Sequence, residues 1–429
     1  MSWLDISPTS PFSLDNIPFG VCSAEHQPEP RVAVAIGDYA FNLCGFADAN
    51  GFKHLPSIQP HLDVFRQSTL NAFAALGRTI HRQVRQYLRE VFQKDTPYPD
   101  VLKDNKALQD ELLVPLKYVR YHVPLKIGDY TDFYAGLNHA RNMGSLLRPS
   151  NPLMPNYKHL PVAYHGRASS VVVSGTPIVR PRGQVLEKPF GGTGEPFLSP
   201  SRWLDFELEL AAFVCRSNKL GQPVSVDEAD EYIFGFVLMN DWSARDIQAW
   251  EYVPLGPFNA KNFATTISPW VVLPDALEPF RTQALEPADR ESILPYLREK
   301  RASNVYDIKL EVELRPAGAT EKTRITTSNA KNLLYSFPQM IAHHTIGGCN
   351  LQVGDLLGSG TISGPEPGME GSLVEKTKGG KEPITLADGS KRVFLMDGDE
   401  VTLRAIAGSE GAYVGFGDCV GTVLPAVDA

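Results

Sequence analysis

The sequence predicts a mainly β protein with two domains, a small barrel-like N-terminal unit and a large C-terminal β-rich domain. In the first part, short β-forming runs such as residues 31–36 are broken by Pro and Gly, as in small barrels. After about residue 118 the chain is rich in Gly, Pro and β-forming residues and has few helical repeats, which favours one large β domain. We therefore expect an N-terminal domain over residues 1–118 and a C-terminal domain over residues 119–429.

The period of the apolar residues changes within the N-terminal domain. Between residues 61 and 92 it becomes helical, with Leu70, Phe73, Val84 and Leu88 among the repeating positions, so we expect one long helix or a pair of helices as a helical connection. The weakly patterned stretches 181–201 and 275–301 are expected to be surface loops. Six strand candidates are expected in the C-terminal domain, at residues 161–173, 204–214, 232–239, 306–314, 355–357 and 392–396.

The composition is that of an ordinary globular chain. Its 429 residues are 43% hydrophobic and 21% charged, enough for two or more cores. A net charge of −8 and the lack of a basic block disfavour nucleic acid as a partner, and no run reaches the roughly eighteen apolar residues of a membrane span. The five scattered cysteines form no C-x-x-C pair and are typical of reduced thiols, so we expect a cytoplasmic protein.

A row of acidic residues lies in the segment 203–210. As a strand, this segment places Asp205, Glu207 and Glu209 on one face and apolar residues on the other. Like charges about 4 Å apart repel by roughly 4 kcal/mol at an effective dielectric of about 20, so a sheltered row needs a cation or raised pKa values. The alternative is the solvated face of an edge strand, where alternating Glu is common.

A second acidic position follows a buried strand. Residues 232–239 are apolar on both faces, and a turn into a helix is expected at residues 240–241. On that helix Asp241, Arg245, Gln248 and Tyr252 would share one stripe. The stripe could be a solvated face, but the neighbouring tryptophans indicate a packed helix, which favours a pocket lining.

Three further segments carry candidate functional residues. Asp132 is a potential fourth oxygen ligand, and His139 is a potential base, although a single histidine is often structural. Lys261 follows a rigid Pro/Gly loop that could fix its approach, or it is simply a solvated lysine. The small-residue loop 358–367 would let backbone approach a ligand closely, or it is a plain multiple turn.

Absent motifs narrow the chemistry further. The sequence has no G-x-S-x-G, Walker A, H-E-x-x-H or strand-linked G-x-G-x-x-G motif, which removes support for serine hydrolases, P-loop enzymes, zincins and nicotinamide dehydrogenases. The candidate ligands are all carboxylates, which suit Mg²⁺ or Ca²⁺ better than zinc.

Several long motifs resemble the fumarylacetoacetate hydrolase family over nearly the whole chain. They lie at residues 17–21, 129–134, 160–170, 239–248, 250–258, 359–367 and 397–401. The resemblance implies an SH3-like N-terminal domain, a C-terminal mixed β-sandwich roll and a homodimer. It also implies hydrolysis of the carbon–carbon bond of 4-fumarylacetoacetate to fumarate and acetoacetate, the last step of tyrosine and phenylalanine catabolism.

The resemblance also implies roles for individual residues. His139 would be the general base, oriented by Glu375. The implied metal site, for Mg²⁺ and/or Ca²⁺, comprises Asp132, Glu207, Glu209 and Asp241, flanked by Lys261 and Thr265. The implied donors to the reacting atoms are Arg245, Gln248 and Lys261, and the implied substrate contacts are Tyr134, Arg148, Tyr164, Gln248, Tyr252 and Thr361.

Two other functions remain open at this point. One is a related acylpyruvase or decarboxylase of the same superfamily, which would share the metal site and act on another β-dicarbonyl acid. The other is a catalytically silent metal-binding or scaffold protein. The presence of a base, His139, and of the acid that would orient it, Glu375, disfavours the catalytically silent alternative, because a silent protein need not keep them.

Overall fold

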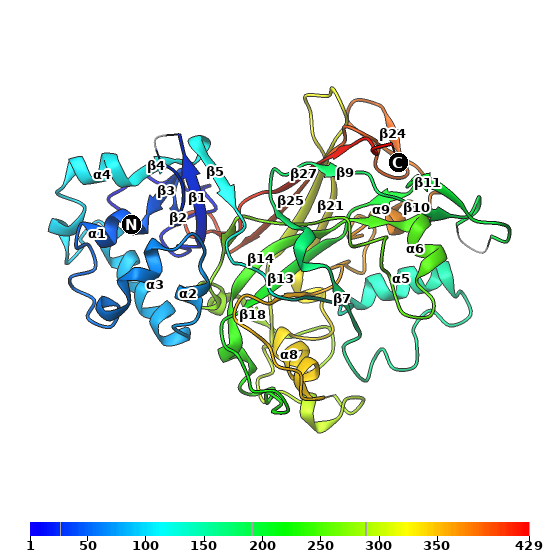
Figure 1. Cartoon of the computed structure of the whole chain (residues 1–429), viewed down its shortest axis with the longest axis horizontal. Coiled ribbons are helices and arrows are strands. Elements are labelled where there is room, and N and C mark those ends of the chain that lie inside the picture. The colour runs from blue at the N-terminus through cyan, green and yellow to red at the C-terminus, as the bar shows by residue number, and fades with distance from the viewer. Residues whose placement is uncertain (26, 190–191, 288–289, 429) are drawn as a thin grey trace.

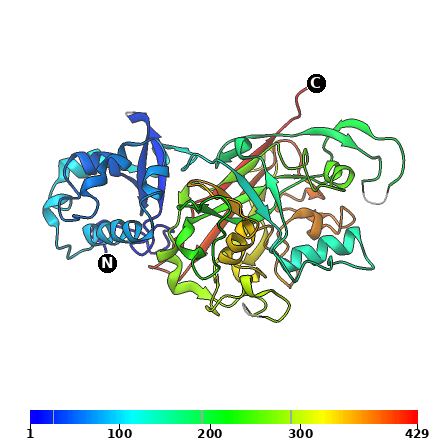
Figure 2. The same cartoon turned by 60° about the horizontal axis from the view of Figure 1, so that its bottom comes forward.

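The chain folds into two lobes that lie side by side (Figures 1 and 2). The computed structural model describes residues 1–25, 27–189, 192–287 and 290–428. The first part of the chain, blue to cyan in Figure 1, forms the smaller lobe, and the rest forms the larger one. Strands dominate the larger lobe, so the expected mainly β fold class is confirmed.

The N-terminal lobe is built on a six-stranded antiparallel sheet. Its order is β17-β1-β2-β3-β4, with β5 paired to β1. The sheet takes one strand, β17, from the second half of the chain, where Gly20 lies opposite Trp270. Its members are β1 (Phe19–Ala24), β2 (Gln27–Ile36), β3 (Tyr39–Asn42), β4 (Leu113–Pro115), β5 (Val119–His122) and β17 (Trp270–Val271).

Helices cover this sheet. The expected helical region divides into three parts, which are a 3₁₀ segment (Gln59–Arg66), the short α2 and the long α3. Gly77, which adopts a positive φ of 81°, separates α2 from α3. Val84, Leu88 and Val91 of α3 are fully buried in the lobe's core, as their spacing predicts. The helices are α1 (Leu43–Asp48), α2 (Asn71–Ala74), α3 (Arg78–Phe92) and α4 (Lys106–Leu112).

A curled seven-stranded sheet forms the centre of the larger lobe. Its order is β7-β6-β22-β13-β14-β16-β8. The two edge strands, β7 and β8, are joined in sequence by only residues 167–170, so the sheet bends round until its edges approach one another. Its strands are β6 (Tyr130–Phe133), β7 (Ala163–Gly166), β8 (Val171–Val173), β13 (Leu208–Val214), β14 (Ile233–Asp241), β16 (Thr265–Ile267) and β22 (Leu356–Gly358).

Both faces of the central sheet are buried. On β13, Leu210 and Ala212 belong to the core beneath a second sheet, whereas Ala211 and Phe213 belong to the core shared with the N-terminal lobe. The same holds for β14, and this two-sided burial explains its continuous apolar sequence. The second sheet runs β21-β20-β25-β27-β9, with β26 paired to β25. Its strands are β9 (Ile178–Val179), β20 (Lys309–Arg315), β21 (Thr323–Asn329), β25 (Glu400–Ala407), β26 (Val414–Gly415) and β27 (Cys419–Leu424).

Short strand pairs and, among the described residues, five helices complete the lobe. Helix α8 begins with a capping box between Ser336 and Gln339. The pairs are β10 (Arg182–Val185) with β11 (Phe197–Pro200), β12 (Leu204–Asp205) with β15 (Ser243–Ala244), β18 (Arg281–Thr282) with β19 (Val305–Tyr306), and β23 (Ile384–Thr385) with β24 (Lys391–Arg392). The helices are α5 (Leu137–Leu147), α6 (Arg245–Glu251), α7 (Pro274–Leu277), α8 (Phe337–Thr345) and α9 (Leu373–Lys376).

Two expectations of irregular structure are corrected. The stretch 181–201 contains the hairpin β10–β11, in which Gly183 lies opposite Ser199. The stretch 275–301 contains most of α7 and the strand β18, as well as a 3₁₀ turn at Pro295–Leu297. Residues 190–191 and 288–289 of these two stretches lie outside the described residues. Both stretches form local elements whose polar, Pro-rich sequences lack a clear apolar period.

All five cysteines are free thiols, as expected; four are buried and Cys349 is exposed. Within the described part of the chain, no helix has both the length and the apolar character that crossing a bilayer requires.

Candidate active site

Four acidic side chains meet inside the curled sheet. Asp132 comes from β6, Glu207 from the link between β12 and β13, Glu209 from β13 and Asp241 from the last position of β14. Each is at most 5% exposed, and one carboxylate oxygen from each lies within 4.8 Å of the others. Strand pairing causes this convergence, because β6 and β13 flank β22 and β13 is hydrogen-bonded to β14.

Two cations face these acids. Lys261 donates to Asp241 Oδ2 over 2.6 Å and also to Glu207 Oε2. The Arg245 Nη1 donates to Glu207 Oε1 over 2.8 Å. Burial alone would raise the pKa of Glu207, but Lys261 and Arg245 hold that pKa below its usual value. Glu207 is therefore an ionised carboxylate already shared between two cations.

Asp132 and Glu209 form no such ion pair among the described residues. Burial, and then the Asp132, Glu207 and Asp241 carboxylates, raise the pKa of Glu209 well above its usual value. Burial and the Asp241 carboxylate raise the pKa of Asp132 likewise. These shifts show that the cluster has an excess of negative charge, which a bound cation would relieve.

The donor atoms fit a hard divalent ion. Glu209 Oε1 is buried and has no hydrogen-bond partner within the described residues, as expected of an oxygen free to coordinate. All four side chains offer carboxylate oxygens, the ligands of Mg²⁺ and Ca²⁺. The Gly360 N–H donates to Glu209 Oε2 over 2.9 Å, and a Cβ there would lie 2.4 Å from the Phe133 carbonyl oxygen, so only glycine allows this approach.

Asp241 is held by two hydroxyl groups as well as by Lys261. The Tyr164 hydroxyl donates to Asp241 Oδ2 over 2.7 Å, and the Thr265 hydroxyl donates to Oδ1 over 3.2 Å. Tyr164, Lys261 and the buried Tyr130 line one wall of a cavity of about 470 Å³. A space of this size, beside the acids, can accept a small-molecule ligand.

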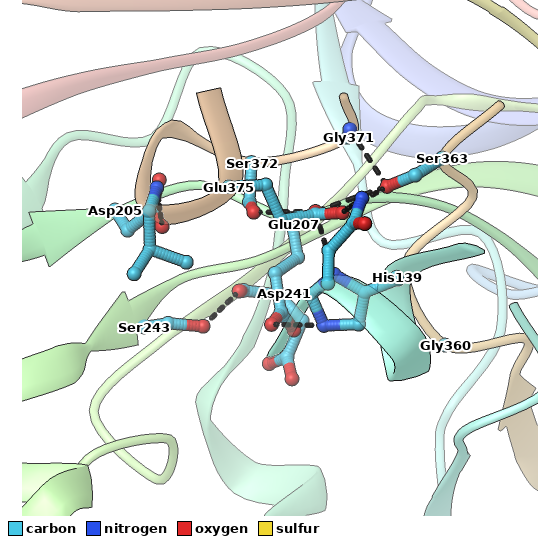
Figure 3. A network of polar contacts seen from close by, with 12 residues as sticks. His139, Asp205, Glu207, Asp241, Ser243, Gly360, Ser363, Gly371, Ser372 and Glu375 are labelled. Atoms are coloured by element: carbon cyan, nitrogen blue, oxygen red, sulfur yellow. Dashed lines mark hydrogen bonds and ion pairs between the residues drawn. The ribbon is translucent and has the colours of Figure 1, made fainter. Parts of the chain in front are cut away.

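A histidine and a glutamate form a buried pair beside the acids (Figure 3). His139 lies in the first turn of α5, and its Nδ1 is 2.6 Å from Glu375 Oε2. His139 Nε2 points the other way and lies 3.6 Å from Glu207 Oε1. Glu375 therefore occupies Nδ1 and leaves Nε2 directed at the acidic cluster, the arrangement that a general base requires.

Glu375 is itself held in place by three further donors. Asn142 Nδ2 donates to Glu375 Oε1 over 2.9 Å, and the Ser372 hydroxyl donates to Oε2 over 2.7 Å. The Ser363 hydroxyl lies 2.9 Å from both carboxylate oxygens. Burial would raise the pKa of Glu375, but His139 and these donors lower it below its usual value. The pair thus consists of an ionised acid and an imidazole in fixed orientation.

The expected helical stripe is wrong in one respect. Asp241 does not lie on the helix, because β14 continues through it to pair with Thr265 of β16, and α6 begins only at Arg245. Arg245 and Gln248 do share a face of α6, and Arg245 Nη1 donates to Gln248 Oε1 over 3.2 Å. Tyr252 is the C-terminal cap of α6.

Of the remaining predicted contacts, Tyr134 lies against His139. The Tyr134 ring packs edge-on against the His139 ring, with centroids 5.5 Å apart. Thr361 has a buried hydroxyl, and Arg148 has a buried Nε; neither atom has a hydrogen-bond partner in the described residues. Arg148 is the C-terminal cap of α5, and within the described part of the chain neither Arg148 nor Tyr252 forms a hydrogen bond or ion pair with the four acids.

The structure also reveals residues that the sequence reasoning missed or misplaced. Asp205 was expected on the same face as the two glutamates, but β12 ends at Asp205 and β13 begins only at Leu208, so its carboxylate points elsewhere. Tyr130 is 2% exposed and its hydroxyl has no partner within the described residues. Its position two residues before Asp132 on the same strand was the signal that could have identified it.

Fold and site together define a mainly β protein with a buried cluster of carboxylates that could hold a metal ion beside a histidine–glutamate pair. Residues 129–424 match the C-terminal domain model of fumarylacetoacetate hydrolase, and residues 15–124 match the N-terminal domain model of fumarylacetoacetase. The chain belongs to the fumarylacetoacetate hydrolase family and is a hydrolase.

Relatives and a solved structure agree with this assignment. The chain is 68% identical to the fumarylacetoacetase of Aspergillus fumigatus over 99% of both chains. It is 46% identical to the human fumarylacetoacetase over 100% of this chain and 99% of that one. The fold resembles that of a fumarylacetoacetate hydrolase from Exiguobacterium antarcticum, with a TM-score of 0.52 and 16% identity over 95% of this chain and 99% of that one.

Proposed function

We propose that this chain is a metal-dependent fumarylacetoacetase, which hydrolyses the carbon–carbon bond of 4-fumarylacetoacetate to fumarate and acetoacetate in the last step of tyrosine and phenylalanine catabolism. The observation that carries the proposal is the 2.6 Å contact between His139 Nδ1 and Glu375, set beside the four clustered acids. Identity of 68% to a fumarylacetoacetase along almost the whole chain supports the substrate.

The chemistry explains why such a site is needed. Carbon is a poor leaving group, so the site must stabilise both an alkoxide on the attacked carbonyl and the enolate that departs. A divalent ion held by Asp132, Glu207, Glu209 and Asp241, flanked by Lys261 and Thr265, would supply positive charge to the diketone oxygens. Either Mg²⁺ or Ca²⁺ suits these ligands.

The chain's own residues perform the proton transfers. His139 Nε2 removes a proton from water, whose oxygen bonds to the carbonyl carbon next to the fumaryl double bond. Glu375 keeps the imidazole in the required tautomer and stabilises the imidazolium that forms, because it is buried and ionised. When the carbon–carbon bond breaks, the electron pair moves to the acetoacetate part as an enolate, which takes up the proton that His139 removed from water.

Hydrogen-bond donors complete the proposed site. Arg245, Gln248 and Lys261 donate to the developing negative charge, and Arg245 Nη2, buried without a partner among the described residues, supports this role. The proposed substrate contacts, including those that hold its two carboxylates, are Tyr134, Arg148, Tyr164, Gln248, Tyr252 and Thr361.

A substrate panel tests the proposal against its nearest alternative. The purified protein with Mg²⁺ is offered fumarylacetoacetate, several acylpyruvates and oxaloacetate, and the products are identified by chromatography. The proposal expects kcat/KM for fumarylacetoacetate to exceed the others by at least about 100-fold. A preference for an acylpyruvate, or release of CO₂ from oxaloacetate, would instead assign the related acylpyruvase or decarboxylase activity.

We also propose a cytoplasmic homodimer with a domain boundary near residue 118. The free cysteines support a cytoplasmic location. The boundary is supported by the two family models, because the match to the N-terminal model ends at residue 124 and the match to the C-terminal model begins at residue 129. Beyond α6, Val253, Leu255 and Phe258 are 66%, 95% and 67% exposed, which supports burial against a second copy. Analytical ultracentrifugation of the wild type and Leu255→Asp tests the dimer.

A further inference from the structure

Asp205 is a fully buried carboxylate that lies outside the metal cluster (Figure 3). Its two oxygens accept four hydrogen bonds. Oδ1 accepts from the Phe206 N–H over 2.8 Å and from the Leu373 N–H over 2.7 Å. Oδ2 accepts from the Val374 N–H over 3.0 Å and from Arg245 Nε over 2.9 Å. Asp205 therefore connects a strand end to two segments that are distant in sequence.

Each of those segments carries part of the proposed chemistry. Arg245 is the guanidinium that also donates to Glu207. Leu373 and Val374 form the first turn of α9, directly before Glu375. The Glu375 carboxylate in turn fixes His139. One buried anion thus lies between the cation that touches a proposed metal ligand and the turn that orients the proposed base.

We propose that Asp205 is a positioning residue of the active site, which holds the Arg245 guanidinium and the Glu375 turn in register so that His139 faces the reacting water. This inference rests on the proposed function. Asp205 acts through Arg245 and through the pair of Glu375 and His139, and it does not touch the substrate.

The geometry excludes a role for Asp205 as a metal ligand. It is not among the four acids whose oxygens come within 4.8 Å of one another. Its acceptor positions are occupied by three backbone N–H groups and one guanidinium N–H, which leaves little capacity for an ion. Because Asp205 engages Arg245 through Nε, the Nη2 of Arg245 stays without a partner within the described residues and can donate to a ligand.

The substitution Asp205→Asn isolates this role. An amide keeps the shape of the side chain, but its NH₂ group is a donor and replaces one acceptor oxygen. In one orientation the NH₂ group faces the Val374 N–H and Arg245 Nε, and in the other it faces the Leu373 and Phe206 N–H groups. All four of these groups are also donors, so either orientation sets donor against donor. The Glu375 turn or Arg245 must then shift. We expect kcat to fall by roughly 10- to 100-fold, the equivalent of losing one charged hydrogen bond. KM should change by less than about 3-fold, since Asp205 does not touch the substrate.

A matched control separates positioning from stability. Asp399 is another fully buried aspartate that accepts from an arginine, Arg392, and from a backbone N–H, that of Met396. Among the described residues its side chain accepts hydrogen bonds from Arg392 and Met396 and from none of the proposed site residues, so Asp399→Asn should lower the melting temperature and leave kcat within about 2-fold of the wild type. If Asp205→Asn gives no folded protein, the same measurements are made on Asp205→Ser, which is smaller and still accepts a hydrogen bond.

A double-mutant cycle tests the route through Glu375. If Asp205 acts by placing Glu375, the variant Asp205→Asn/Glu375→Gln should have a kcat within about 3-fold of the slower single variant. Affinity for Mg²⁺, measured by calorimetry, should stay within about 5-fold in Asp205→Asn. Multiplied effects on kcat in the double variant would overturn the route through Glu375, and an unchanged kcat in Asp205→Asn would overturn the inference as a whole.

Failure of the proposed function would be recognised separately. If the wild type cleaves none of the offered substrates, the proposed function is wrong. Crystal structures of the wild type and of Asp205→Asn, determined for this purpose, then test the inference. We then expect the Nδ1–Oε2 contact between His139 and Glu375 in the wild type and its loss or lengthening beyond 3.2 Å in Asp205→Asn. An intact contact in both proteins would overturn the positioning role.

Discussion

Replacement of Glu375 by glutamine should slow turnover without weakening substrate binding. Glu375 is a buried, ionised acceptor 2.6 Å from His139 Nδ1. A hydrogen bond to a charged group contributes about 1.5–3 kcal/mol, and here it strengthens when His139 becomes an imidazolium. Because about 1.4 kcal/mol corresponds to a tenfold change in rate, kcat should fall by roughly 10- to 150-fold. KM should stay within about 2-fold, since Glu375 does not touch the substrate.

The assay follows loss of the diketone absorbance at saturating substrate and over a range of concentrations, with a thermal melt of each protein. Ser372→Ala is the matched control, because it removes a donor to Glu375 Oε2 and leaves the carboxylate in place; its kcat should fall less than about 5-fold. A folded Glu375→Gln protein with kcat within about 2-fold of the wild type would refute the reasoning, since the charge on Glu375 would then have no part in catalysis.

Three further predictions concern the metal, the backbone and the pH dependence of stability. Glu209→Gln removes the charge of an acid with an unpartnered oxygen, so calorimetry should show at least about 10-fold weaker Mg²⁺ binding with little change in melting temperature; unchanged affinity would exclude Glu209 as a ligand. Gly360→Ala places a Cβ 2.4 Å from the Phe133 carbonyl oxygen at a φ of +76°, and urea unfolding should show a loss of at least about 1–2 kcal/mol; an equally stable variant would contradict the close approach. Burial raises the pKa of Glu299 from 4.5 to about 7, so its contribution to stability is fully present below pH 4.5 and is lost as the pH rises through 7. Between pH 5 and pH 8 the wild type should therefore lose about 2–3 kcal/mol relative to Glu299→Gln, and a constant difference between the two proteins would contradict this.

The local patterns of the sequence predicted much of this fold. Period-two alternation brought Glu207 and Glu209 together, although Glu207 lies in the link between β12 and β13 and only Glu209 lies on a strand. A continuous apolar run predicted a strand buried on both faces, which is β14. Helical spacing identified α3. These features depend on neighbouring residues, so they are visible in a single sequence.

The errors came from contacts between distant segments. Pairing of β14 with β16 carries the strand through Asp241 and delays the helix to Arg245, and no local signal shows that pairing. The break after β12 turns Asp205 away from Glu207 and toward α9, 168 residues further along the chain. His139 and Glu375 are 236 residues apart in the sequence. Only the resemblance to a family, and not the local pattern, therefore suggested that they form a pair.

The central claim is that the four clustered acids hold a divalent ion on which cleavage of fumarylacetoacetate depends. The most direct measurement is product formation by the purified protein before chelation, after chelation and after restoration of Mg²⁺ or Ca²⁺. We expect equimolar fumarate and acetoacetate from the untreated protein, loss of both products after chelation, and recovery when the ion is restored. Cleavage that continues at full rate in the metal-free protein, or no cleavage with either ion present, would contradict it.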